Sequence, residues 1–95
     1  MPMKRCLLDG NDIHSLSDLY DRLSIGLGLP EHFGRNLDAL WDLLSADVEG
    51  PFAIVWKQAD VSRKLMGRDF ERVVQLLQEL EQERDDFTLK IEAQG

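Results

Sequence analysis

Two acidic side chains, Asp38 and Asp42, stand four residues apart in a segment, 36–46, that has the pattern of a helix. Residues at positions i and i+4 of a helix share one face, with their side chains about 6 Å apart. Two carboxylates at that spacing resemble neighbouring phosphates of RNA, and a protein that binds phosphate through Arg, Lys and His would bind them as well. The two acids also fit an ordinary solvated face, because they lie opposite the apolar stripe and the helix dipole favours an anion at Asp38. The spacing alone therefore does not distinguish a partner-binding site from an ordinary solvated surface.

His32 raises the alternative of acid–base catalysis together with Asp38 and Asp42. The sequence has no glycine-rich phosphate loop and no G-x-S-x-G nucleophile elbow. The histidines, His14 and His32, are far apart, and neither has a histidine or cysteine at metal-ligand spacing. Cys6 falls in a predicted strand, where we expect a buried, unreactive thiol. We therefore expect no enzymatic activity, no metal and no cofactor.

The chain is acidic, with a formal net charge of −7 and a pI of about 4.6. Phosphate backbones repel such a chain, so we expect no nucleic-acid partner, whereas basic protein surfaces attract it. The acids concentrate in two segments: residues 36–55 have four acids and no base, and residues 79–86 have five acids and one base. These two segments are the candidates for an acidic surface.

Length and composition predict one globular domain over residues 1–95, since 43% of the residues are hydrophobic and 31% are charged. The longest apolar runs are about five residues, whereas a membrane span needs about 20, so no membrane segment is expected. The N-terminus is basic but lacks the apolar stretch of a secretory signal. Cys6 is the only cysteine, which is typical of a reducing cytoplasm, and we expect the protein there.

Hydrophobic periodicity predicts three strands and four helices as the frame for these acids. The strands are expected at 3–8, 52–56 and 87–91, and the helices at 16–27, 36–46, 58–66 and from a cap at Asp69 to Leu80. The middle strand is continuously apolar, which predicts a central strand buried on both faces. Helical crossovers between strands imply parallel pairing and right-handed connections. We therefore expect an α/β fold, βααβααβ, with a three-stranded parallel sheet in the order 1-2-3 and the helices on one face.

Residues 29–44 have the sequence LPEHFGRNLDALWDLL. The run from Asn36 to Asp42, preceded by Leu29-Pro30 and Gly34, resembles the hallmark of the barstar family, the intracellular inhibitors of bacterial guanyl-preferring ribonucleases. The resemblance extends along the chain, because features in the other elements fall in a similar order. These features include Gly10, Pro51, Trp56, Gln58 and Ser62. The family fold, a three-stranded parallel sheet with helices, agrees with the predicted elements.

The resemblance implies that Asp42 would occupy the phosphate site of the ribonuclease as the dominant contact, with Asp38 beside it. The other positions that it implies as partner-binding are His32, Gly34, Asn36, Leu76 and Glu79. Gly34 would allow close approach of the partner or supply a turn with positive φ. Glu79 has Glu81 and Glu83 close by in the sequence, so plain surface charge remains an alternative for it. Trp41 lies on the apolar stripe, and we expect it to pack against the core.

The chain departs from the family pattern at His32 and at Asp47. His32 stands where family members often carry a tyrosine that stacks on the active site of the enzyme, and Asp47 stands where a second tryptophan is known. The resemblance implies an intracellular inhibitor that blocks the active site of a small, basic, extracellular-type ribonuclease in a 1:1 complex and is a monomer when free. The alternative is a barstar-like acidic module that binds another basic protein.

Overall fold

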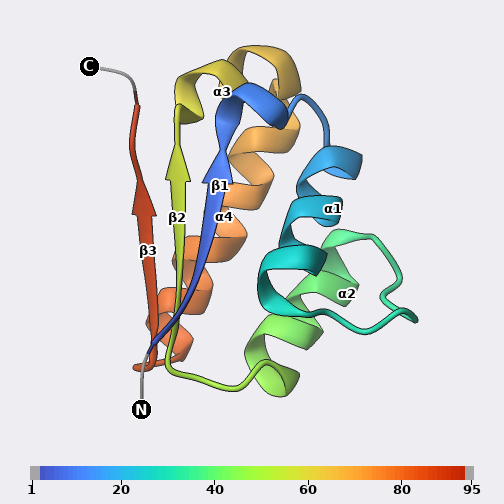
Figure 1. Ribbon diagram of the computed structural model, residues 1–95, viewed down its shortest axis with the longest axis vertical. Helices are drawn as coiled ribbons and strands as arrows, with labels where there is room; N and C mark the ends of the chain where they lie inside the picture. Colours follow the sequence, from blue (N-terminus) through green and yellow to red (C-terminus); the bar gives the residue numbers. More distant parts are fainter. Residues whose placement is uncertain (1–2, 94–95) are drawn as a thin grey trace.

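The computed structural model describes residues 3–93, in which strands and helices follow the predicted order (Figure 1). The elements are β1 (Lys4–Asp9), η1 (Gly10–Asp12), α1 (Leu16–Leu27), α2 (Leu37–Asp42), η2 (Leu43–Asp47), β2 (Phe52–Lys57), α3 (Ala59–Met66), α4 (Arg68–Glu83) and β3 (Phe87–Ile91). Both strand pairs are parallel and the sheet order is β1-β2-β3, so the predicted α/β topology is confirmed. Within residues 3–93, every helix is too short or too polar to cross a membrane.

The two faces of the sheet differ in character. On the face toward the helices, alternate strand residues are buried, as Cys6 and Leu8 of β1 show. On the opposite face Leu7 pairs in register with Val55, which pairs with Lys90, and no helix covers this row (Figure 1). The helices therefore cover one face, as predicted. The middle strand is buried on the helix side and only half-buried at Val55 on the open side.

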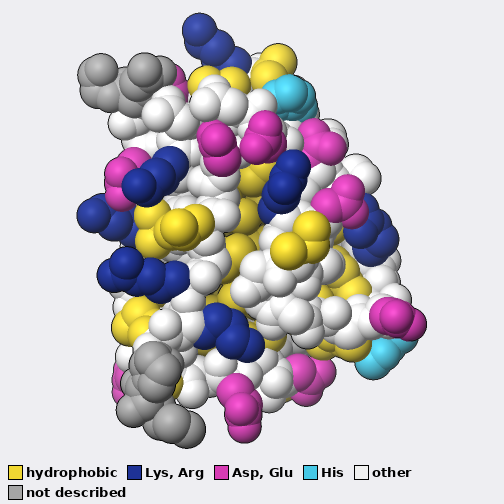
Figure 2. Space-filling model, in the orientation of Figure 1, with side chains coloured by type: hydrophobic (Ala, Val, Ile, Leu, Met, Phe, Trp, Pro, Cys, Tyr) yellow, Lys and Arg dark blue, Asp and Glu magenta, His cyan; other side chains and the backbone are white. Residues whose placement is uncertain are grey.

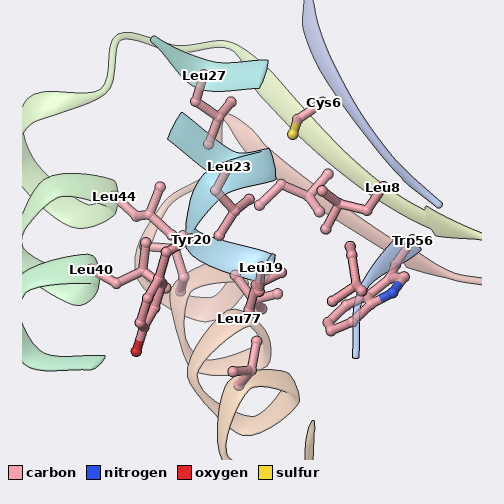
Figure 3. Packing of buried hydrophobic residues seen from close by; sticks show 14 of the residues in the cluster. Cys6, Leu8, Leu19, Tyr20, Leu23, Leu27, Leu40, Leu44, Trp56 and Leu77 are labelled. Carbon is pink, nitrogen blue, oxygen red and sulfur yellow. The ribbon is translucent and has the colours of Figure 1, made fainter. Parts of the chain in front are cut away.

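The core forms between the sheet, α1, α2 and α4 (Figure 3). The apolar stripe of α1 points inward and is fully or almost fully buried at Leu19, Leu23 and Leu27. Leu40 and Leu44 approach this stripe from the α2 side, at exposed fractions of 0%. Each buried leucine stabilises the fold by about 1.5–3 kcal/mol relative to an exposed one. The inner face of α2 thus packs against the core, and its outer face is exposed to solvent.

The junctions between strands and helices explain several residues that carry the family resemblance. Trp56 Nε1 donates to Ser62 Oγ over 3.3 Å, and Ser62 Oγ donates to the carbonyl oxygen of Gly10 over 3.1 Å. A Cβ on Gly10 would overlap the carbonyl oxygen of Gln58, so only glycine fits there. These contacts tie the end of β1 to the end of β2 and the start of α3.

The prediction that Asp69 caps the last helix is wrong. The helix begins at Arg68, and Gly67 occupies both the C-cap of α3 and the N-cap of α4. Gly67 has φ 62° and ψ −128°, a conformation that essentially only glycine adopts. The chain therefore reverses at one residue, and Asp69 falls inside the first turn of α4.

Candidate partner-binding surface

The side chain of Asn36 starts α2 and fixes the loop before it. Its Oδ1 accepts a hydrogen bond from the backbone N–H of Ala39 over 2.7 Å, and its Nδ2 donates to the carbonyl oxygen of Gly34 over 3.3 Å. An asparagine at this N-cap satisfies one of the N–H groups that a helix start leaves without a partner. Asp38 and Asp42 are both exposed on the helix that follows. Their spacing within one α-helical segment places them on the same side of α2.

The helix does not stay α-helical to Ala46 as predicted. After Asp42 it widens into η2, where the Val48 N–H donates to the carbonyl oxygen of Leu43, five residues back, over 2.9 Å. Arg84 Nη1 donates to the carbonyl oxygens of Leu44 and Val48 over 2.7 and 2.8 Å. The last carbonyl groups of a helix have no intrahelical hydrogen-bond donors, and Arg84 supplies the missing donors here. The local sequence of α2 holds no signal for this, because the donor is 40 residues away in Arg84.

Part of the second acidic segment stabilises the fold. Asp86 forms a two-bond ion pair with Arg84, with both donor–acceptor distances 2.8 Å. The hydrogen bond from Arg84 lowers the pKa of Asp86 below its ordinary value of 3.8, and the hydrogen bond to Asp86 raises the pKa of Arg84. Glu81 accepts a hydrogen bond from the Leu89 N–H over 3.0 Å and so joins α4 to β3. Two of the five acids of this segment therefore stabilise the fold: Glu81 joins α4 to β3, and Asp86 pairs with Arg84, which contacts η2.

A groove of about 380 Å³ lies between α2 and α4 and brings three of the predicted residues together. Asp38 lines it from α2, and Leu76 and Glu79 line it from α4. Glu79 is exposed, and its Oε1 accepts a hydrogen bond from Gln75 Nε2 over 3.3 Å. The two acidic segments therefore meet at this groove, whose lining combines apolar side chains with Asp38, Glu79, Gln75 and Arg72.

Trp41 is half-buried and packs against the core, as expected, and it also forms part of the groove wall. Arg72 lines the same groove, and its Nη1 lies 3.8 Å from Asp69 Oδ1. Sequence reasoning missed Arg72 as a site residue. The available signal was its spacing, because Arg72 lies four residues before Leu76 and seven before Glu79 and therefore shares their helix face.

The loop from Gly28 to Asn36 leaves α1 at a left-handed C-cap, Gly28, with φ 67°. The Phe33 N–H donates to the carbonyl oxygen of Pro30 over 3.0 Å, which closes a β-turn with His32 at a corner. Phe33 is buried edge-on against Tyr20, with ring centroids 5.4 Å apart. His32 is consequently held at the exposed side of an anchored loop.

Gly34 does not supply a turn with positive φ, so that alternative is wrong. The left-handed residue is its neighbour Arg35, with φ 53°. A Cβ on Gly34 would lie 3.3 Å from Ala39 Cβ and 3.4 Å from Asn36 Nδ2, which is tighter than ordinary packing. Gly34 therefore allows the loop to lie close to the first turn of α2.

Asn36 and Asp38 also line a second hollow with Arg35 and Tyr20. This hollow shares Leu37 and Asp38 with the groove between α2 and α4, so the two depressions adjoin. His32 and Gly34 lie on the loop that leads into them, and Asp42 lies one turn further along α2. We call the surface formed by these residues the acidic surface. Its members are His32, Gly34, Asn36, Asp38, Asp42, Leu76 and Glu79.

The open face of the sheet carries exposed basic side chains together with Asp9, which pairs in register with Lys57. Figure 2 shows Lys and Arg side chains gathered over the sheet side of the molecule. Arg5, Lys57 and Lys90 are exposed at positions that alternate with the buried strand residues. Since the helices cover the other face of the sheet, these three bases lie on a different side of the fold from Asp38, whose own neighbours in the two depressions include Arg35 and Arg72.

Cys6 faces the core and is 1% exposed. Burial raises the pKa of the Cys6 thiol to about 11, so almost no thiolate is present near neutral pH. The prediction that this thiol is buried is confirmed.

The fold and the site define a small α/β protein that presents an acidic helix and loop above a one-sided parallel sheet. The sequence model of the family described as "Barstar (barnase inhibitor)" matches residues 3–94. A similar protein is "Putative ribonuclease inhibitor YrdF" of Bacillus subtilis (strain 168), which is 36% identical over 91 residues, covering 95% of this chain and 100% of that protein. The chain belongs to the barstar family.

Proposed function

We propose that this protein inhibits a small, basic, guanyl-preferring ribonuclease by covering its active site with the acidic surface. Family membership and the similarity to the Bacillus subtilis protein support ribonuclease inhibition in general. The observation that carries the more specific proposal is the exposure of Asp38 and Asp42 on one side of α2, next to Glu79 across the groove.

The chemistry is mimicry of the substrate phosphates. A ribonuclease holds the RNA backbone with cationic side chains, and a carboxylate accepts the same charge-assisted hydrogen bonds. Asp42 would occupy the phosphate site, and Asp38 would pair with a neighbouring cation. No cofactor or metal takes part, and the chain performs no reaction of its own.

The remaining members of the acidic surface would shape the contact. His32 would pack its ring against the enzyme, and Gly34 would let the loop backbone approach closely. Leu76 would add apolar contact beside Glu79. Asn36 would act by holding Gly34 and the first turn of α2 in place, because its Oδ1 and Nδ2 are engaged there.

The setting we propose is a bacterial cytoplasm in which a monomer binds one enzyme molecule. Cys6 is a single buried thiol, which suits a reducing compartment. An inhibitor of this kind would protect the cell from its own ribonuclease before export of the enzyme. The exposed carboxylates of Asp38, Asp42 and Glu79 would speed the encounter with a basic enzyme.

A titration of RNA cleavage tests this function. We expect cleavage by a small basic guanyl-preferring ribonuclease to fall to zero near one equivalent of the protein. Full cleavage in excess protein would contradict the proposal for that class of enzyme. The second candidate function is binding of a different basic protein. The departures from the family pattern at His32 and Asp47 favour it. Capture of a basic protein other than a ribonuclease, without inhibition of cleavage, would support this second candidate.

A further inference from the structure

Arg35 is a basic residue in the middle of the acidic surface, between Gly34 and Asn36. It adopts a left-handed conformation, with φ 53°, which is uncommon for a residue with a side chain. This backbone conformation directs the chain into α2 while the guanidinium lies back on α1, where all of its described contacts are found.

Three residues of α1 receive the guanidinium. Arg35 Nη1 lies 2.9 Å from Asp21 Oδ1. Arg35 Nη2 donates to the carbonyl oxygen and to Oγ of Ser17, both over 3.1 Å. The guanidinium carbon also lies 5.6 Å from the centre of the Tyr20 ring, within range of a cation–π contact. An arginine makes such a set because its planar fork offers several donors in fixed directions, which a lysine does not.

These contacts have an electrostatic consequence for the acidic surface. A cation that pointed outward beside Asp38 would repel the basic partner that the acids attract. Asp21 neutralises this cation, and the hydrogen bonds to Ser17 hold it against α1. The same contacts hold the loop against α1. The buried ring of Phe33, which packs against Tyr20, is a second contact that holds it there.

We propose that Arg35 and Asp21 are positioning residues for partner binding: their ion pair on α1 fastens the 29–36 loop and keeps the Arg35 charge away from the incoming basic protein. This proposal rests on the proposed function, because it assumes a basic partner at the acidic surface. It goes beyond that function in assigning a role to two residues outside the predicted contact positions.

The first test concerns the loop and needs no partner. Amide hydrogen exchange is measured in the free protein for wild type, Asp21→Asn and Arg35→Asn. Asparagine tolerates the left-handed conformation, so Arg35→Asn removes the contacts without forcing the backbone. We expect faster exchange at residues 31–36 in both variants and unchanged exchange in the core strands. Wild-type exchange of the loop in both variants would overturn the fastening role.

The second test concerns the charge and uses the association rate with the ribonuclease. Asp21→Asn should associate roughly two- to fivefold more slowly than wild type, because the freed cation opposes the electrostatic steering. The matched control is Asp12→Asn, which makes the same change of charge at a residue that lines the same hollow as Asp21. A rate for Asp21→Asn equal to that of Asp12→Asn would overturn the masking role.

The double variant separates charge from loop order. Asp21→Asn/Arg35→Asn lacks the ion pair just as Asp21→Asn does, but it has no free cation. We expect it to associate faster than Asp21→Asn at low salt, with the difference disappearing at high salt. An equally slow double variant would contradict masking. Failure of the wild type to bind any ribonuclease would refute the proposed function, while the exchange experiment would still decide whether the pair fastens the loop.

Discussion

Arg84 Nη1, at the end of α4, lies 2.7 Å from the carbonyl oxygen of Leu44 in η2. The same nitrogen reaches the carbonyl oxygen of Val48 over 2.8 Å, and the guanidinium carbon lies 4.9 Å from the centre of the Phe52 ring. The helix that carries Asp38 and Asp42 is thus held at its far end by a side chain from another helix. Asn36 holds the near end.

Arg84→Met should destabilise the fold by about 2–4 kcal/mol, because it leaves the two carbonyl oxygens without their charged donor. The free energy of unfolding from denaturant titration measures this. Arg63→Met, at an exposed position of α3, is the control and should change it by less than about 0.5 kcal/mol. Equal stability of the two variants would show that Arg84 does not hold η2.

The ion pair between Asp86 and Arg84 should make stability depend on pH in the acid range. The pKa of Asp86 is lower in the folded protein than its ordinary value of 3.8. The unfolded chain therefore takes up this proton first as the pH falls, and the stabilisation is complete above 3.8 and lost as the pH falls through the folded pKa. Asp86→Asn should flatten the loss of unfolding free energy on acidification below about pH 4. Asp85→Asn is the control, and an identical acid dependence in both variants would refute the assignment.

Sequence patterning predicted the strands, their order and the helices, because alternating burial in the sheet and the apolar stripes of the helices are local signals. A side-chain cap is also a local signal, and Ser15 provides one at the start of α1, where its Oγ accepts a hydrogen bond from the Asp18 N–H. The cap prediction failed at Asp69, because a glycine between the two helices made a side-chain cap unnecessary.

The geometry of the candidate surface was predicted to the extent that it depends on spacing within one helix. Asp38 and Asp42 are exposed as expected, and Leu76 and Glu79 line the same groove as Asp38. The contacts that hold the site could not be predicted, since they join distant segments. Arg35 reaches Ser17 and Asp21 of α1, and Arg84 reaches η2 from the end of α4.

Association with the ribonuclease should be fast and sensitive to salt. The net charge of −7 and the exposed carboxylates of Asp38, Asp42 and Glu79 attract a basic active site and steer the encounter. Raising the ionic strength from 0.1 M to 1 M shortens the screening length from about 10 Å to about 3 Å. Stopped-flow kinetics should show the association rate falling over this range far more than the dissociation rate rises. An association rate independent of salt would mean that the acids are not the contact surface.

His32 should make the affinity depend on pH. Histidine gains its charge on acidification between about pH 8 and pH 5, and a positive ring at the corner of the loop would face a cationic active site. Affinity should therefore be highest where the ring is neutral and should decline as it becomes protonated. His32→Tyr keeps an aromatic ring without this charge, and titrations of both proteins across that pH range provide the comparison. Identical profiles would remove His32 from the contact surface.

The inhibition constants of wild type and Asp42→Ala against the same ribonuclease test the central claim most directly. We predict that Asp42→Ala loses about 2–5 kcal/mol of binding free energy, because a buried cationic pocket of the enzyme is left without its anion. Asp38→Ala should lose less and Glu79→Ala less again, and the exposed positions predict that all three stay folded. Asp12→Ala serves as the control for net charge and should inhibit nearly as well as wild type. Asp42→Ala inhibiting as tightly as wild type would contradict the account.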